Sequence, residues 1–253
     1  MLIQQIRNAT VKITCAGSTF LVDPWFQDKG TGFSAIAVRP EMQGVRNPLD
    51  DLPDSPEHIL AGVDFCLVTH VHPDHVTKDY IPEDMPMIAQ NAADAEKLRQ
   101  TGFQQVRWFT DESMVIGGVH ITRVDGVHGD TPEAVRRMGM VSGYVIRAEG
   151  EKTLYIAGDT VWYDGVRDTI RAYQPGVMLV NCAAATTPIG RLIMNLGDLE
   201  SVYEEAQDAL IVASHLDSVN HATVTRADVR RWIVEKAATH VLVPENGQAI
   251  AVD

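Results

Sequence analysis

Four residues that can bind metal ions lie within six positions of this chain. They are His70, His72, Asp74 and His75, in the run His70-Val71-His72-Pro73-Asp74-His75. Neutral imidazole and carboxylate groups are suitable ligands for zinc, iron or manganese. A chance match to the spacing HxHxDH in a chain of this length is on the order of one in a thousand. The run therefore indicates a metal site rather than a polar turn with solvated histidines.

The residues before this run explain how its side chains could converge. Residues Val63 to Thr69 form a short apolar segment that predicts a buried strand, and the histidines begin where it ends. The chain must turn there, and a turn can direct neighbouring side chains toward one point. Two later segments also place a possible ligand after a strand-like run. They are Val124-Asp125-Gly126-Val127-His128-Gly129 and Leu154-Tyr155-Ile156-Ala157-Gly158-Asp159-Thr160.

With these three segments the sequence resembles the metallo-β-lactamase superfamily over nearly its whole length. Members carry HxHxDH at a strand end, then a His after a later strand, then an Asp after an apolar strand and often a Gly. The resemblance implies an α/β (α+β) fold, the four-layer αββα metallo-β-lactamase sandwich, with residues 1–253 as a single domain. Within the superfamily the chain is similar to the L-ascorbate-6-phosphate lactonase-like and uncharacterised metal-dependent hydrolase branches.

The resemblance also implies a binuclear metal site. The first metal would be held by His70, His72 and His128. The second would be held by Asp74 and His75, with Asp159 between the two metals. Three neutral imidazoles leave one tetrahedral position open for water, and a bridging carboxylate offsets the charge of two close cations.

The last ligand of the family pattern is a His near the C-terminus, and two residues fit it. His215 directly follows the strand-like run Leu210–Ser214, whereas His221 lies in a less regular segment. We expect His215 to be the ligand and keep His221 as the alternative. For catalysis we single out Asp74, which would orient the water, and His215. Whichever of the two histidines is not a ligand is a candidate proton donor to the leaving group.

These residues predict a hydrolase with two divalent metal ions, Zn²⁺ first, with Mn²⁺ or Fe²⁺ as alternatives. A metal-bridged hydroxide would cleave an ester, lactone or phosphodiester bond of a small molecule. The position that is Cys in many true β-lactamases is Asp159 here, which argues against β-lactam turnover. Two other functions fit the same ligands: an iron-dependent oxidoreductase on this fold, and a non-catalytic metal-binding protein.

Composition limits the partners. The formal net charge is −13, so we expect no nucleic acid partner. No apolar stretch approaches the roughly 18 residues of a membrane span, and the N-terminus does not read as a secretion signal. We therefore expect no membrane association and a cytoplasmic address. A small-molecule substrate is the expected partner, and a homo-oligomer is compatible with the sequence.

Substrate specificity is expected to come from the stretch Trp25 to Ile59 and from around Met138-Gly139-Met140 or Thr186-Thr187-Pro188-Ile189-Gly190-Arg191. The stretch from Trp25 to about Ile59 reads as one long irregular loop, which is typical of a functional segment. Its aromatic residues Trp25, Phe26 and Phe33 could form the wall of an apolar pocket. Arg39, Arg46 or Arg191 could meet an anionic group. Asp23 could accept a hydrogen bond from a metal-bound imidazole or be an ordinary residue at a strand end.

Several other elements can be read from the chain. The start predicts a β-meander, and Asn91 to Gln100 predicts a helix capped by Asn91. A second meander follows, and after Asp159 helices alternate with strands. The last helix opens at Thr225 and Asp228, a pair that resembles a capping box.

Overall fold

The two large β-sheets are the centre of the computed structural model, which describes residues 1–252. Asp253, the last residue of the expected domain, lies outside the described residues. The first sheet has the order β16-β1-β2-β3-β4-β5-β6 and the second β15-β14-β11-β10-β9-β8-β7.

The bounds of the elements are as follows. The first sheet contains β1 (Leu2–Arg7), β2 (Thr10–Cys15), β3 (Ser18–Val22), β4 (Phe65–Val68), β5 (Met87–Ala89), β6 (Val106–Trp108) and β16 (Ala249–Ala251). The second contains β7 (Ser113–Ile116), β8 (Val119–Gly126), β9 (Val141–Arg147), β10 (Leu154–Ile156), β11 (Val177–Asn181), β14 (Leu210–Ser214) and β15 (Val241–Leu242). A small hairpin is formed by β12 (Thr186–Thr187) and β13 (Gly190–Arg191). The α-helices are α1 (Pro56–Leu60), α2 (Ala92–Gln100), α3 (Pro132–Met138), α4 (Asp164–Tyr173), α5 (Leu196–Glu205) and α6 (Arg226–Lys236), and a short 3-10 helix, η1, spans Pro40–Met42.

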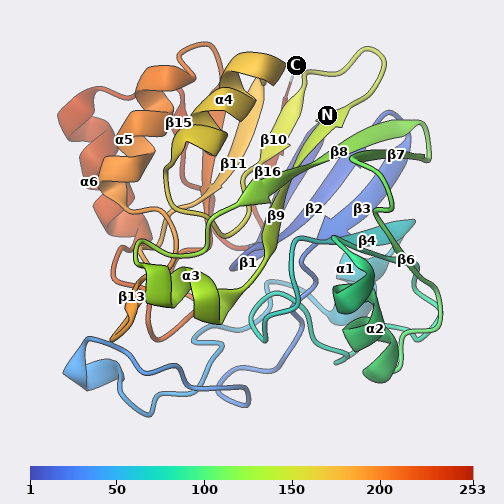
Figure 1. Cartoon of the computed structure of the whole chain (residues 1–253), viewed down its shortest axis with the longest axis horizontal. Helices are drawn as coiled ribbons and strands as arrows, with labels where there is room; N and C mark the ends of the chain where they lie inside the picture. The colour runs from blue at the N-terminus through green and yellow to red at the C-terminus, as the bar shows by residue number, and fades with distance from the viewer. Residues whose placement is uncertain (253) are drawn as a thin grey trace.

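Three apolar clusters hold four layers together. Phe20, Leu67 and Ile121 belong to the cluster between the two sheets. A second cluster joins the second sheet to α4, α5 and α6, and a third joins the first sheet to α1 and α2. Figure 1 shows α4, α5 and α6 on one side of the sheets and α1 and α2 on the other. This arrangement confirms the predicted αββα sandwich, because each sheet buries one face against its partner and one against helices.

The strand directions bring polar segments to one edge of the sandwich. In the first sheet β3, β4, β5 and β6 are parallel, and in the second β10, β11, β14 and β15 are parallel. The carboxyl ends of parallel strands lie at the same edge of a sheet, which is where open α/β sheets bind ligands. The segments after β4, β10 and β14 are those in which the sequence indicates metal ligands.

Most predicted elements are present, and a few were missed. The Asn91 side chain accepts a hydrogen bond from Asp94 N at the start of α2, and Thr225 and Asp228 form the capping box of α6. The stretch expected to be irregular up to Ile59 instead contains α1, which Ser55 caps and Pro56 opens. A Ser-Pro pair is a typical start of a helix, so α1 was predictable from these two residues. Helix α3 and strands β5, β7 and β16 were also not predicted.

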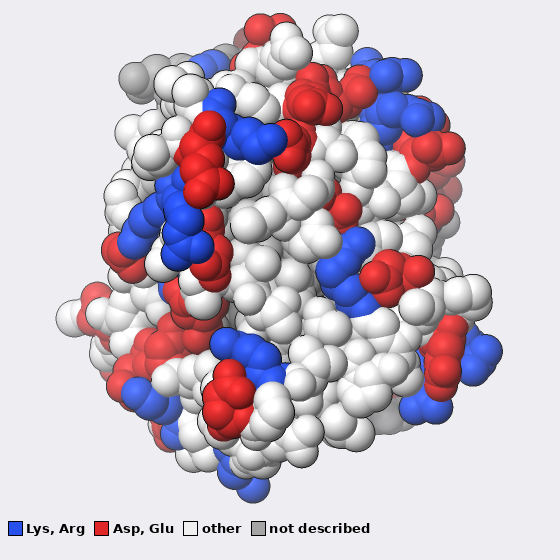
Figure 2. Space-filling model, turned by 90° about the vertical axis from the view of Figure 1, so that its left-hand side faces the viewer, with Lys and Arg blue, Asp and Glu red and all other residues white. Residues whose placement is uncertain are grey.

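Charge is mixed on the face that carries the second-sheet helices. Basic and acidic side chains lie next to each other there (Figure 2), and pairs such as Arg171 with Glu205 and Lys236 with Glu200 join them. Within residues 1–252, no helix is both long enough and apolar enough to cross a membrane.

Candidate metal centre

The turn after β4 places the histidine run at the edge of the sandwich. His75 N and Val76 N both donate to His72 O, at 3.0 and 3.2 Å, so the chain reverses within a few residues. His70, Asp74 and His75 are buried, and His72 is partly exposed. The turn thus directs all four side chains into the space where the two sheets meet.

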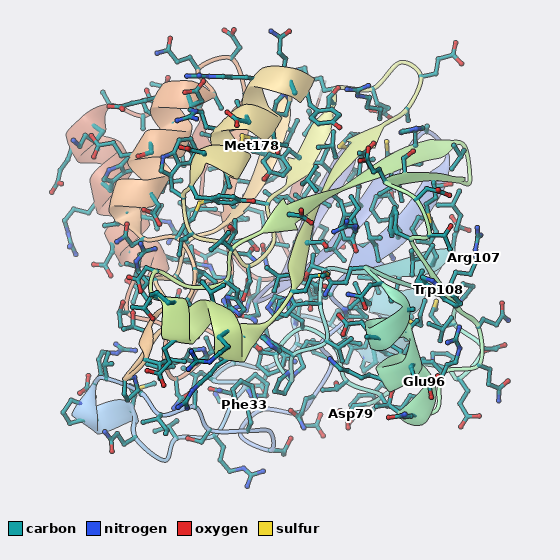
Figure 3. All side chains as sticks on the ribbon, viewed as in Figure 1. Phe33, Asp79, Glu96, Arg107, Trp108 and Met178 are labelled. Carbon is teal, nitrogen blue, oxygen red and sulfur yellow. The ribbon has the colours of Figure 1, made fainter. Side chains whose placement is uncertain are left out.

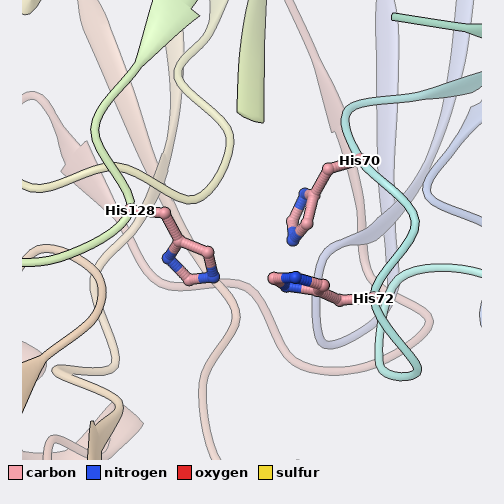
Figure 4. Close-up of side chains that lie close together, drawn as sticks. All are labelled: His70, His72 and His128. Carbon is pink, nitrogen blue, oxygen red and sulfur yellow. The ribbon is translucent and has the colours of Figure 1, made fainter. Parts of the chain in front are cut away.

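The first group of potential ligands is His70, His72 and His128. One ligand atom from each lies within 4.8 Å of the others. Figure 4 shows the three rings directed toward a common point, with His128 arriving from the segment after β8. His128 Nδ1 is 2.9 Å from Leu192 O, which leaves Nε2 toward that point. The buried Nε2 of His70 has no hydrogen-bond partner in the protein, as expected of an atom that binds a metal.

The second group is Asp74, His75 and His215, whose ligand atoms also lie within 4.8 Å of one another. A third combination, His70, His75 and Asp159, connects the two groups. Asp159 Oδ2 is 3.1 Å from His75 Nε2 and 3.8 Å from His215 Nε2. The structure therefore brings all seven residues expected as ligands into one continuous cluster, with Asp159 between its two halves.

Hydrogen bonds behind these side chains fix their orientation. Asp23 Oδ2 accepts from His75 Nδ1 at 2.8 Å, and Asp23 Oδ1 accepts from Thr69 N at 2.7 Å. Of the two interpretations of Asp23, the structure supports contact with a histidine of the cluster. Asn181 Nδ2, at the end of β11, donates to Asp159 Oδ1 at 2.7 Å. Such outer contacts orient ligands and tune their basicity.

The buried carboxylates of the cluster favour the binding of cations. Asp23, Asp74 and Asp159 are each less than a tenth exposed, and in the described chain their ion-pair partners are all histidines. Burial of carboxylates without positive charge is unfavourable. Burial would lower the pKa of His75, yet the charges of Asp159 and Asp23 raise it well above its ordinary value. In the metal-free protein a protonated imidazole thus provides the positive charge that divalent ions would provide.

The first group has the opposite electrostatics. Burial lowers the pKa of His70 well below its ordinary value and the pKa of His72 to about 4, and it also lowers the pKa of His128. Neighbouring histidines add to the effect on His70 and His72. These imidazoles are neutral near pH 7, which is the form that binds metals. The donor types and their protonation states therefore fit divalent metal ions.

The structure separates the two candidates for the last ligand. His215 Nε2 lies 3.4 Å from Asp74 Oδ2 and belongs to the second group, whereas none of the potential metal groups among residues 1–252 includes His221. His215 directly follows β14 and has a positive φ of 64°, a backbone conformation that residues other than glycine adopt rarely and mostly at functional sites. His221 instead lines a cavity, and its buried Nδ1 has no partner in the protein.

A cavity of about 210 Å³ opens onto the cluster. Its walls are mainly apolar and are formed by Phe33, Ala35, Met138, Ala185 and Leu192, together with Pro73 and Thr187. His72, Asp74, His128, Asp159 and His221 form its polar end. Figure 3 shows Phe33 at the edge of the sandwich that carries α3, whose Met138 lines the same cavity.

Each of the three segments expected to set specificity contributes to the cavity, through Phe33, Met138 and Thr187, but the pocket is only partly as predicted. Phe33 lines the cavity, but Trp25 and Phe26 are fully buried in the core. Arg39 and Arg46 donate to the backbone oxygens of Ala222 and Thr31. Arg191 binds Ile193 O and the Asp198 carboxylate. Within the described chain, none of these three arginines lines the cavity.

Sequence reasoning missed three polar residues that support the cluster. Asn8 Nδ2 lies 3.0 Å from Asp74 O and 3.2 Å from His215 Nε2. Asn181 binds Asp159, and Thr69 Oγ1 lies 3.0 Å from His70 Nδ1. Asn181 is the last residue of β11, and Thr69 directly follows β4 and precedes His70, so both lie where a strand ends. A polar residue at a strand end could have indicated Asn181 and Thr69 as supporting residues. Asn8 lies in a tight turn, where its residue type indicates nothing about the cluster.

Comparison with known proteins identifies relatives of this chain. A family model described as "Beta-lactamase superfamily domain" matches residues 18–216. The UPF0173 protein YddR of Bacillus subtilis is 39% identical over 256 residues, which cover 98% of this chain and 99% of YddR.

Two solved structures are similar over the whole chain. One is a possible metal-dependent hydrolase from Veillonella parvula, with 33% identity, a TM-score of 0.93, and coverage of 100% of this chain and 99% of that protein. The other is an isothiocyanate hydrolase from Delia radicum gut bacteria, with 34% identity, a TM-score of 0.92 and the same coverage.

Proposed function

Because the chain belongs to the beta-lactamase superfamily, as a metal-dependent hydrolase related to the UPF0173 proteins, we propose that its substrates are small, uncharged, apolar electrophiles, with isothiocyanates first. The observation that carries this proposal is the cavity at the metal cluster. Its volume is about 210 Å³ and its walls are mainly apolar. No Lys or Arg is among the residues of the described chain that line it.

This cavity distinguishes between the bonds that the metal chemistry could cleave. A phosphodiester carries a negative charge, and sites for such groups usually add Arg or Lys contacts to the metals. An ester or lactone is neutral and presents a carbonyl carbon, and an isothiocyanate is neutral and presents the central carbon of its N=C=S group. The resemblance to the isothiocyanate hydrolase across the full chain favours the isothiocyanate. Esters and lactones are the second candidates.

We propose that two divalent ions bind, with zinc as the first expectation. His70, His72 and His128 would hold one, and Asp74, His75 and His215 the other, with Asp159 between them. When bound, such ions lower the pKa of a coordinated water from 15.7 to about 7 and polarise the electrophile.

The chain's own residues would guide the reaction. Hydrolysis of an isothiocyanate adds water oxygen to the central carbon and a proton to nitrogen, and the resulting thiocarbamate releases an amine and carbonyl sulfide. Asp74 lies at the polar end of the cavity, where its carboxylate can orient the attacking water. His221 lies there too, outside the ligand groups, and burial lowers its pKa to about 4. Its neutral imidazole can therefore accept a proton from the attacking water and pass it to the substrate nitrogen. Phe33 and Leu192 exclude bulk water.

The test compares four substrates with the zinc-loaded protein. Methyl and allyl isothiocyanate should be hydrolysed fastest, 4-nitrophenyl acetate more slowly, and bis(4-nitrophenyl) phosphate least. His72→Ala should abolish turnover, and His58→Ala, at an exposed position outside the cluster, should leave it unchanged. Faster cleavage of the phosphodiester, or no turnover of any isothiocyanate or ester, would overturn the proposal. Iron at one or two ions per chain in protein from its own source, with thiol-dependent oxygen uptake, would favour the oxidoreductase instead.

A further inference from the structure

The wall of the substrate cavity that contains Phe33 and Ala35 belongs to a loop with little buried apolar surface. Between Thr31 and Arg46 the side chains are mostly exposed or half-buried, and Ala37 is the one buried apolar side chain within that range. Apolar burial gives most of the energy that holds a loop in place, and here it is limited to Ala37 and to Phe33, which is partly buried against the second-sheet cluster. The rest of the loop depends on specific polar contacts.

One buried side chain provides most of these contacts. Asn220 is 0% exposed, and its Oδ1 accepts from Ala35 N at 3.2 Å and from Asn47 Nδ2 at 3.1 Å. Its Nδ2 donates to Ala35 O at 2.8 Å and to Met42 O at 3.1 Å, and it also lies 3.4 Å from Ser34 Oγ. The amide group of Asn220 therefore holds both ends of the loop's inner turn.

Asn47 completes the same connection. Its Oδ1 accepts from Asn220 N at 2.7 Å, and its own backbone N donates to Phe33 O at 2.8 Å. Asn47 is also 0% exposed. Phe33, a residue of the cavity wall, is thus linked to Asn220 through one intermediate residue.

The position of Asn220 in the chain connects these contacts to the polar end of the cavity. It directly precedes His221, which lines the polar end of the cavity. The rings of Phe33 and His221 are 6.3 Å apart and meet edge to face at 64°. Asn220 therefore sets the distance between the apolar wall and the polar end of the cavity.

We infer that Asn220 is a positioning residue that determines which substrates fit, by holding Phe33 and Ala35 at a fixed distance from the metal centre. This inference rests on the proposed function for its substrates. An aspartate in its place has the same shape but presents a carboxylate to two carbonyl oxygens. Asn220→Asp should therefore release the loop as Asn220→Ala does.

The test measures size selectivity with methyl, propyl and hexyl isothiocyanate. In Asn220→Ala we expect KM for methyl isothiocyanate to rise about 10-fold with a smaller change in kcat, because the wall no longer confines a small substrate. The ratio of kcat/KM for hexyl over methyl isothiocyanate should rise about 10-fold. Asn47→Ala should act in the same direction, and the double variant should add little, because both side chains serve one connection.

A control separates this role from a general loss of stability. Asn195→Ala removes the side chain that caps α5, where it accepts from Asp198 N, and it should leave the hexyl-to-methyl ratio unchanged. An unchanged ratio in Asn220→Ala would overturn the inference. Hydrogen exchange of the zinc-loaded protein provides a readout without substrate. The amides of Ala35 and Asn47 should exchange at least 10-fold faster in Asn220→Ala, while those of the turn after β4 should not change.

The two proposals can fail separately. If wild type hydrolyses no isothiocyanate, the proposed substrate class is wrong, and 4-nitrophenyl acetate and hexanoate replace the series. If the loop amides keep their protection in Asn220→Ala, the positioning role is wrong whatever the substrate.

Discussion

The Asp23 carboxylate accepts a hydrogen bond of 2.8 Å from Nδ1 of His75, at the join between β3 and the turn after β4. The same carboxylate also accepts from the backbone and the hydroxyl of Thr69. One buried acid, outside every potential ligand group among residues 1–252, thus orients the imidazole that belongs to two of those groups. Metal affinity should depend on this residue although it does not reach the metal.

Asp23→Asn should lower metal affinity about 10- to 100-fold, the usual effect of losing an outer carboxylate. Asn tolerates the positive φ of 47° at this position, so the backbone should be retained. Competition with a chelator measures the affinity. The control is Asp64→Asn, at the opposite end of β4, where the carboxylate accepts from Thr19 N. Equal affinities for wild type and Asp23→Asn would contradict the assigned role.

Gly158 fixes the backbone immediately before Asp159. Its φ is +67°, and a Cβ there would lie 2.6 Å from Ser142 O, closer than real contacts allow. Gly158→Ala should therefore displace Asp159 and lower both stability, by roughly 1–3 kcal/mol, and metal affinity. Gly150→Ala is the matched control, since Gly150 has a φ of +76° with open space around it. It should cost about 1 kcal/mol and leave metal affinity unchanged. Chemical denaturation and chelator competition measure the two effects, and equal metal affinity in both variants would refute the argument.

The two C-terminal histidines should give opposite results when replaced. His215→Ala removes a member of the second group and should reduce bound metal from two equivalents toward one, as measured by elemental analysis after dialysis. His221→Ala should keep its metal and lower kcat about 10²-fold, the lower end of the range for a positioned proton donor. If His221→Ala lost metal and His215→Ala did not, the two roles would be reversed.

The fold was largely predictable because its elements carry local signals. The apolar run before His70 predicted β4, and Asn91, Thr225 and Asp228 marked the starts of two helices. Strands such as β5 and β16 are three residues long, too short for any periodicity to appear. They exist because a neighbouring strand supplies hydrogen bonds, and that neighbour is distant in the sequence: β16 pairs with β1.

The candidate site likewise contains residues that could be predicted from the sequence and residues that could not. Its potential ligands are of residue types that seldom cluster by chance, so their order along the chain was enough to select them. Asn8, Asn181 and Asn220 are ordinary turn or strand-end residues in sequence, and the structure alone reveals what their amides contact. The residues of the cavity wall also could not be identified from the sequence. Nothing local distinguishes Phe33, which lines the cavity, from Trp25 and Phe26, which are core residues.

Acid should destabilise the metal-free protein through its neutral buried histidines. Burial lowers the pKa of His72 and His221 to about 4, whereas the unfolded chain binds these protons near pH 6.5. Between these values the unfolded state holds more protons, so the free energy of unfolding falls as the pH falls. Each such histidine adds up to about 1.4 kcal/mol per pH unit. The carboxylates of Asp159 and Asp74 outweigh burial and raise the pKa of His215, so its contribution has the opposite sign near pH 6.5 and fades as the pH falls below about 5.5.

Urea unfolding of chelator-treated protein at several pH values between 6.5 and 4 measures this slope. His221→Gln cannot titrate, so its slope should be shallower than that of wild type by up to about 1.4 kcal/mol per pH unit. Asn195→Ala removes a side chain that does not titrate and should leave the slope unchanged. Equal slopes for wild type and His221→Gln would mean that the pKa of His221 is not lowered, so the folded protein would protonate it below about pH 6.5 as readily as the unfolded chain does. It would then carry a positive charge in the cavity, and the preference for uncharged substrates would have to be reconsidered.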